Sequence, residues 1–448
     1  MRLEGHPVST GIHMRKFFKF DELGTNYRTE IVGGVTTFFA MAYIVVVNPA
    51  ILSEAGFPKD ASMTATIVAA VIGTLLMAFY ARRPFAVAPY MAENAFLAYT
   101  VCIAMGVPWQ TALGAVCLGG VIFVITTALR IRSWVATAMP DSLKHSFAVG
   151  IGFFMMFIGL NQTGLVRLGD TGSPVRIGVL SSPGPLLAIF CMILICVLMI
   201  RRVPAAILIG MLGTSAIGYV LGIAECPTGV VSLPPSLAPT FLKLDIPAAL
   251  TRDVLPVVLV LFVLDFVDTM GTLVGVSARA GLLDKNLNLA EIEKPMMADA
   301  VATVTGALAG TSTTGTYIES AAGIEAGARS GFASLVTAAM FILCLFFAPV
   351  FLAVPAPAYG AALVVVGFLM LAPVKHIPFD DYSELFPAVV TIMLMSFTYN
   401  IAFGMTAGFV LYPLFKIVSG RTRELSWGTW VLFAISALFF LLYPYSKV

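Results

Sequence analysis

Four acidic side chains stand inside, or at the edge of, long apolar stretches where carboxylates are rare. They are Glu93, Asp265, Asp268 and Glu319. Placing an ionisable group at membrane depth costs about 2.5–3.5 kcal/mol on insertion scales, so such a group usually faces a cavity and has a function there. The four acids therefore predict a polar site in the middle of a membrane, suited to a small ligand and a proton.

The spacing of two of these acids suggests how a proton could be held. Asp265 and Asp268 are three residues apart, so on a helix they share one face. Two carboxylates that lie close together in a low-dielectric cavity resist ionising together. We therefore expect this pair to titrate as a unit and, with Glu319, to couple proton movement to ligand movement.

The elements that must carry these residues are membrane helices. The chain has 448 residues, of which 59% are hydrophobic and 11% are charged, and its mean hydropathy is +0.95. A spanning helix needs about 20 apolar residues, and the sequence has many such runs. The expected fold class is an all-α polytopic membrane protein, forming a single integral membrane domain over residues 1–448.

Hydropathy predicts twelve apolar spans and three weaker, broken ones. The weaker ones lie near 87–105, 296–310 and 311–327, and they contain Gly, Pro, Ser, Thr or acidic residues. The twelve spans lie near 31–52, 61–81, 109–131, 145–162, 183–200, 204–223, 254–276, 331–353, 359–373, 385–400, 402–418 and 427–444.

The positions of Lys and Arg predict the orientation of the chain. If the N-terminus is cytoplasmic and the segments alternate, only six of the 26 basic residues fall on the outer side. An excess of basic residues in cytoplasmic loops is the usual sign of orientation. We therefore expect an inner or plasma membrane protein with its N-terminus in the cytoplasm.

Two broken segments occupy matching positions in the two halves of the chain. One runs from Ala86 to Asn94 and the other from Gly310 to Ser320. Each follows two spans, and seven segments per half would give the halves opposite topology. Paired interrupted segments of this kind indicate a transporter's binding site, and the run of β-branched threonines at 311–316 favours extended backbone before a half-helix.

Three sequence motifs resemble the AzgA-like purine permeases of the nucleobase–cation symporter superfamily. They are Asn48-Pro49-Ala50-Ile51-Leu52, the stretch from Leu264 to Asp284, and the stretch from Gly310 to Ile324. The resemblance covers about residues 18–418. It implies about 14 transmembrane segments in a 7+7 inverted repeat, with short strands in segments 3 and 10 followed by half-helices.

The resemblance also assigns parts and residues. It implies a core part at 30–132 and 250–353, and a gate part at 140–225 and 356–445, with a homodimer through the gate part. It places substrate on Asn94, Asp265, Asp268 and Glu319. This chain departs from the family pattern by carrying Glu93 just before the asparagine, which we also assign to the site, and by Gly315 within a threonine run.

These residues suit a purine base. Ionised carboxylates accept ring N–H groups, Asn94 can donate and accept, and backbone N–H groups that begin half-helices can meet a carbonyl. Phe96, Tyr317 and Phe266 are candidates to cover the ring. We expect import of guanine, hypoxanthine or adenine by symport with a proton rather than sodium, with no cofactor, metal or nucleic acid.

Other assignments remain open from the sequence alone. Each acid could be structural, most readily Glu93 as a first-turn residue. Asp299 and Glu325 are expected near cytoplasmic ends of short segments, as solvated or structural residues. The same fold could carry uracil, xanthine or a small anion. A membrane enzyme or a channel is disfavoured, because the chain has neither an HExxH pair nor a Walker motif.

Overall fold

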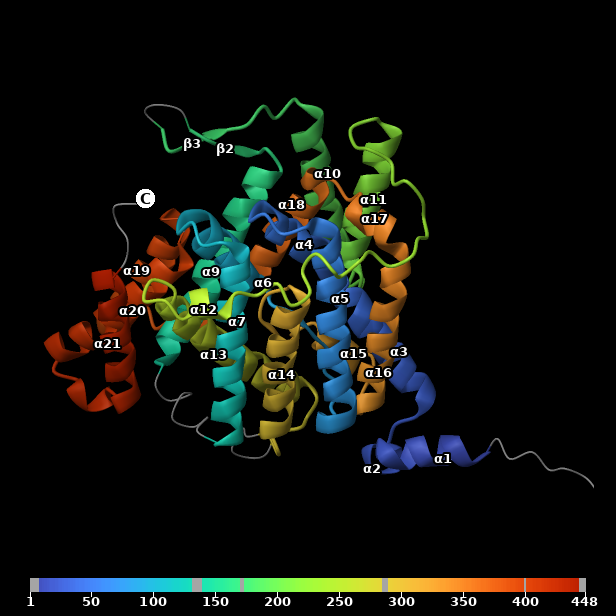
Figure 1. Cartoon of the computed structure of the whole chain (residues 1–448), viewed down its shortest axis with the longest axis horizontal. Helices are drawn as coiled ribbons and strands as arrows, with labels where there is room; N and C mark the ends of the chain where they lie inside the picture. The colour runs from blue at the N-terminus through green and yellow to red at the C-terminus, as the bar shows by residue number, and fades with distance from the viewer. Residues whose placement is uncertain (1–7, 131–138, 170–172, 284–288, 399, 443–448) are drawn as a thin grey trace, which may run out of the picture.

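A computed structural model describes residues 8–130, 139–169, 173–283, 289–398 and 400–442 (Figure 1). Within these ranges nine helices are long and apolar enough to cross a membrane, and four shorter apolar helices accompany them. This confirms the all-α membrane class. The strands are very short. A segment surrounded by hydrocarbon can satisfy its own backbone hydrogen bonds only as a helix, so most of the chain is helical.

Among the described residues, the first half of the bundle has seven segments. Two short helices, α1 (Val8–Phe17) and α2 (Phe20–Leu23), precede them. The segments are α3 (Tyr27–Met41) with α4 (Ile44–Glu54), α5 (Lys59–Leu76) with η1 (Met77–Ala81), β1 (Val87–Pro89) with α6 (Met91–Ala95) and η2 (Phe96–Ala104), α7 (Trp109–Ala128), α9 (Asp141–Gln162), α10 (Pro183–Ile200) and α11 (Ala206–Val220).

The second half repeats this order and adds one helix. After the short α12 (Ile246–Ala249) come α13 (Leu255–Arg279), α14 (Glu293–Ala309), β4 (Thr314–Thr316) with α15 (Ser320–Glu325), α16 (Gly331–Cys344) with η3 (Leu345–Phe347) and α17 (Ala348–Leu352), α18 (Ala356–Leu369) with η4 (Ala372–His376), α19 (Tyr382–Phe397), and α20 (Ile401–Val418). A short turn, η5 (Thr422–Glu424), leads to the additional α21 (Trp427–Leu442).

The two broken segments meet as predicted. β1 and β4 pair antiparallel, with Ala88 opposite Gly315. The ends of the ladder are symmetric, because the N–H of Tyr90 donates to the Thr313 carbonyl and the N–H of Tyr317 donates to the Ala86 carbonyl, each at 2.9 Å. Antiparallel pairing of equivalent strands is what two halves of opposite orientation require. Each strand then leads into a short helix.

Gly315 explains how the strands can approach one another. A Cβ at this position would lie 2.4 Å from the ring of Tyr90, a distance that no side chain tolerates. The ring of Tyr90 therefore occupies the space that a threonine side chain would need. The departure at Gly315 from the expected threonine run is a packing requirement of this chain.

Many of the helix contacts fall into two groups. In one group, α3 contacts α16, α5 contacts α14 and α16, and α7 contacts α13 and α14. In the other, α9 contacts α18 and α19, α10 contacts α11 and α18, and α19 contacts α20. Figure 1 shows α19, α20 and α21 on one side of the molecule and α3, α5 and α16 on the other.

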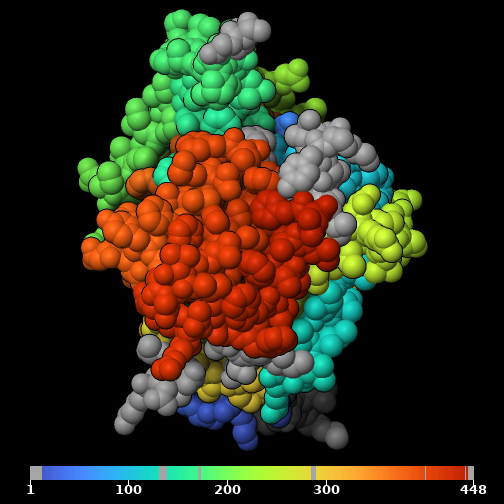
Figure 2. All heavy atoms as spheres, turned by 90° about the vertical axis from the view of Figure 1, so that its left-hand side faces the viewer, coloured from blue at the N-terminus to red at the C-terminus, as the bar shows by residue number. Residues whose placement is uncertain are grey.

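One feature was not anticipated. The loop after α9 contains a hairpin of β2 (Val166–Leu168) and β3 (Val175–Ile177), which lies at one end of the molecule in Figure 1. The additional α21 packs on α20. Seen from the side of these C-terminal helices, the red and orange segments cover most of the face (Figure 2).

Candidate functional site

Glu93 and Asp268 form the centre of the acid cluster. Glu93 lies on α6 and is completely buried, whereas Asp268 on α13 is partly exposed. The charges of Asp268 and Asp265 both act on the Glu93 carboxyl, and that of Asp268 acts more strongly. Neither oxygen of Glu93 has a partner that could donate to it within the described part of the chain. The coupling of Asp265 with Asp268 stays a prediction, and Glu93 lies in the electrostatic neighbourhood of both.

Asp265 is linked to the strand β4 by a hydrogen-bonded threonine. Its Oδ2 accepts the hydroxyl of Thr303 at 2.8 Å, and the same hydroxyl accepts the N–H of Thr314 at 3.0 Å. Asp265 is 1% exposed, and its Oδ1 is buried without a hydrogen bond among the described residues. Asp265 therefore lies against the strand that supports the site, one helical turn from Asp268.

A fifth carboxylate, Asp299 on α14, binds the same strand. It is fully buried, so of the two expected roles the structural one holds and the solvated one does not. Its Oδ2 accepts the N–H of Thr316 at 2.9 Å, and its Oδ1 accepts the Thr316 hydroxyl at 3.0 Å. Hydrogen bonds of this type to a carboxylate are the stronger kind. Glu325, by contrast, is exposed and pairs with Arg279, as expected of a solvated residue.

Glu319 caps the start of α15 and meets the first spanning segment. Its Oε1 accepts the hydroxyl of Tyr43 at 2.7 Å. Tyr43 is 2% exposed and sits between α3 and α4, while Glu319 is partly exposed. Its other oxygen makes no hydrogen bond with the residues that the structure describes. Tyr43 could not be singled out from the sequence, because nothing in an apolar run marks where the helix will break.

Asn94 lies beside the acids and close to the first segment. Its Nδ2 donates weakly to the Asn48 carbonyl at 3.4 Å, and its Oδ1 is buried without a partner in the described ranges. Asn48 in turn donates to Thr66 at 2.7 Å and Thr311 at 2.8 Å. The Asn48-Pro49 motif therefore ties α4 to α5 and to the chain entering β4.

Two equivalent tyrosines cover the strand crossing. Tyr90 follows β1 and Tyr317 follows β4, and their rings stack with centroids 6.2 Å apart and an interplanar angle of 8°. Tyr317 lies in the electrostatic neighbourhood of Glu319, Glu93 and Asp268. Its hydroxyl donates to the Pro89 carbonyl at 2.5 Å. Phe266 packs with Phe123, their centroids 5.4 Å apart, and Phe96 is buried in the core.

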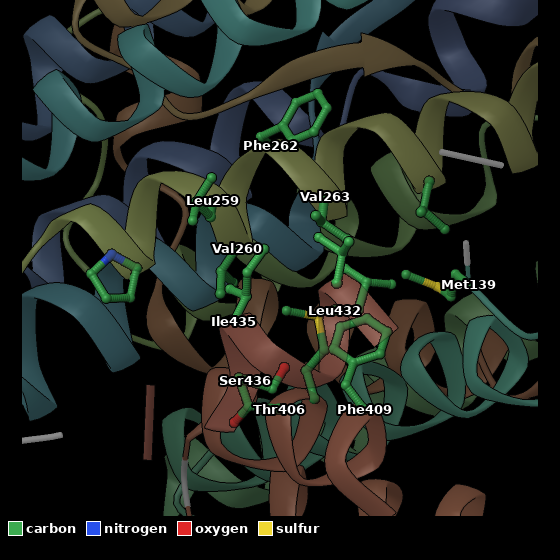
Figure 3. A pocket seen from close by; sticks show the side chains of 14 residues that line it. Met139, Leu259, Val260, Phe262, Val263, Thr406, Phe409, Leu432, Ile435 and Ser436 are labelled. Carbon is green, nitrogen blue, oxygen red and sulfur yellow. The ribbon is translucent and has the colours of Figure 1, made fainter. Parts of the chain in front are cut away.

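An apolar cavity of about 210 Å³ lies elsewhere, between α13 and the helices α20 and α21. Val260 and Val263 line it from α13, Phe409 from α20, and Leu432 and Ile435 from α21 (Figure 3). None of the predicted site residues lines this cavity. Its lining offers little to a polar heterocycle, so it is separate from the acid cluster.

The structure places Glu93 and Asn94 on α6 after β1, Glu319 at the start of α15 after β4, and Asp265 and Asp268 on α13. Groups of buried oxygens without donors cost free energy unless a proton, water or ligand satisfies them. Such a cluster, on broken helices that meet inside a bundle of spanning helices, defines a membrane transporter.

Comparison with known proteins agrees with this class. The chain matches the permease family over residues 28–440 and belongs to it. Guanine/hypoxanthine permease PbuG of Bacillus subtilis is 41% identical, over 96% of this chain and 99% of its own. Adenine permease AdeQ of Escherichia coli is 38% identical, over 95% of each chain. The chain is accordingly a transporter and not an enzyme.

A solved structure supports the fold. The transmembrane domain of the cyanobacterial bicarbonate transporter BicA superimposes with a TM-score of 0.65, covering 86% of this chain and 97% of that domain. The sequence identity is 16%, so the likeness concerns the fold alone.

Proposed function

We propose that this permease imports purine nucleobases across the cell membrane together with protons. The observation that carries the proposal is the set of acceptor oxygens without donors: both oxygens of Glu93, Oδ1 of Asn94, and the second oxygen of Glu319. A purine base is planar and largely uncharged, and its edge carries N–H groups that such acceptors fit. The substrates in the names of PbuG and AdeQ support the same class.

The proton assignment rests on the carboxyl pair. Glu93 is completely buried, and the charge of Asp268 acts on it, so ionising both carboxyls together is costly. A proton shared by the pair provides the coupling. Asp265 and Glu319 contribute acceptors to the same cluster, so substrate and proton occupancy affect one another through charge.

Transport then requires the two helix groups to move relative to each other. We assign the core part to residues 30–132 and 250–353, and the gate part to 140–225 and 356–445. In the core part, β1 and β4 hold the substrate at their crossing. The gate part forms the wall against which the core part moves, and alternating access follows from that motion. The distribution of Lys and Arg supports a cytoplasmic N-terminus.

A competition assay tests the substrate class. Radiolabelled hypoxanthine uptake is measured in cells that lack their own purine carriers, with adenine, guanine, xanthine and uracil as competitors. We expect one or more of adenine and guanine to compete, and uracil not to. Competition by uracil or xanthine alone would move the assignment to another planar solute, and no uptake of any base would overturn the proposal.

A further inference from the structure

Tyr43 occupies the break in the first spanning segment. α3 ends at Met41 and α4 begins at Ile44. At this break the Tyr43 carbonyl accepts two N–H groups, from Val46 at 3.1 Å and from Val47 at 3.0 Å. The tyrosine side chain is buried, and its hydroxyl reaches across the bundle to Glu319.

A second contact fixes the two partners relative to each other. α3 packs directly on α15, and a Cβ on Gly323 would lie 2.0 Å from the Thr37 hydroxyl and 2.4 Å from the Gly33 carbonyl. The close approach of the two backbones leaves α15 little freedom to slide along α3. The Tyr43 hydroxyl therefore meets Glu319 in a defined place.

The bond leaves Glu319 with one oxygen occupied and one available. Oε1 accepts the tyrosine hydroxyl at 2.7 Å, and the second oxygen has no hydrogen-bond partner in the described part of the chain. A carboxylate that is free to rotate presents either oxygen in many directions. One that is fixed by a donor presents a single oxygen in a single direction.

We propose that Tyr43 is a positioning residue for substrate recognition: it holds Glu319 so that its second oxygen accepts an N–H of the purine ring. The inference rests on the proposed function, because it needs Glu319 to contact the base. Tyr43 does not touch the substrate in this scheme and acts through Glu319.

A double-mutant cycle tests the proposal on purified full-length protein, with equilibrium binding of radiolabelled hypoxanthine as the readout. Losing one hydrogen bond to a charged group corresponds to roughly a tenfold or larger change in affinity. We expect Tyr43→Phe to weaken binding about tenfold in the otherwise native protein. In a Glu319→Gln background the same change should have less than about a twofold effect, because the two residues act together.

Tyr412→Phe is the matched control. The hydroxyl of Tyr412 also donates to a glutamate, Glu384, at 2.9 Å, and its ring is also buried. Removing it should leave hypoxanthine affinity unchanged. Tyr43→His, which retains a donor, should recover part of the binding lost in Tyr43→Phe. A purely structural role would instead lower folding yield and melting temperature, with no rescue by a donor.

The outcomes distinguish a failure of the proposed substrate site from a failure of the positioning role of Tyr43. Normal binding by Glu319→Gln would show that Glu319 does not contact the base, and both the site assignment and this inference would fail. If Glu319→Gln loses binding while Tyr43→Phe binds normally, the proposed site stands and only the role of Tyr43 is overturned. Equal losses from Tyr43→Phe in both backgrounds would also overturn it, because the effect would not pass through Glu319.

Discussion

At the scale of single residues, Asp268 has contacts unlike those of the other acids. It is the partly exposed member of the Glu93–Asp268 pair, so it can meet both substrate and solvent protons. We expect Asp268→Asn to abolish hypoxanthine uptake while the protein still reaches the membrane. Uptake and membrane abundance are measured on the same cells. Glu325→Gln, which removes an exposed carboxylate on α15, should transport normally.

A transport rate near wild type for Asp268→Asn would remove the centre of the proposed site. That result would move the coupling function away from α13 altogether.

Gly315 allows a test of packing at the strand crossing. Gly315→Ala places a methyl group 2.4 Å from the Tyr90 ring, so the ring or the strand must move. Forcing extra volume into a packed interior costs about 1–3 kcal/mol. We expect a lower melting temperature in detergent and a loss of binding. Gly213→Ala on α11 is the control, because its Cβ would meet only a leucine methyl at 3.8 Å. Unchanged stability of Gly315→Ala would show that the crossing is loosely packed.

Much of the site could be predicted at this scale, because a carboxylate in an apolar run is rare enough to be noticed without a structure. The residues that hydrogen-bond to these carboxylates could not be predicted, because their types are common in membrane helices. Tyr43 and Thr303 are ordinary residues in such segments, and only the fold brings them to Glu319 and Asp265. Asp299 was expected as a solvated or structural residue near a segment end, and only the structure shows that it is buried against β4.

At the scale of elements, the broken segments could be predicted more completely than the regular ones. A run of threonines and a Pro within a short apolar stretch are poor in helix formers, so extended backbone followed by a half-helix was the natural expectation, and β1 and β4 confirm it. The register and the Tyr90–Tyr317 stacking required the structure, because pairing between residues more than 200 positions apart leaves no local pattern.

The ends of α19 and α20 are joined by a charged network outside the membrane-spanning segments. Asp381 accepts from the N–H and hydroxyl of Ser383 and from Arg421, while Arg421 also donates to Glu424 at 2.5 Å. The Ser383 hydroxyl and the Arg421 guanidinium lower the pKa of Asp381 from 3.8 to about 2. Because the folded state favours the ionised carboxylate, this group stabilises the fold above about pH 4, and the contribution is lost as the pH falls toward 2.

We therefore expect Asp381→Asn to lower the melting temperature of the purified protein at pH 7. The difference from wild type should shrink as the pH falls below 4, because the wild-type carboxylate then becomes protonated. Melting curves across that pH range measure it, with Asp245→Asn as the control at another helix start. A difference that stays constant with pH would mean that the charge of Asp381 does not stabilise the fold.

At the scale of the whole molecule, composition and charge were sufficient to predict a polytopic membrane protein. Counting apolar spans was not sufficient to predict how the C-terminal helix relates to the repeat. Seven segments per half appear among the described residues, and α21 adds one more. The extra helix packs on α20 and borders the apolar cavity with α13 (Figure 3). Hydropathy detects such a helix but cannot say that it lies outside the repeat.

The source of energy is a property of the whole molecule, because it depends on which ion crosses with the substrate. A single charge moving through about 100 mV contributes about 2.3 kcal/mol, and one pH unit adds about 1.4 kcal/mol. We expect proteoliposomes containing this protein to accumulate hypoxanthine when the outside is acidic or the inside is negative. Uptake should collapse when a protonophore removes the gradient. Liposomes carrying Asp268→Asn control for leakage. A sodium gradient that drives uptake at equal pH, with no response to the protonophore, would refute proton coupling while leaving nucleobase binding intact.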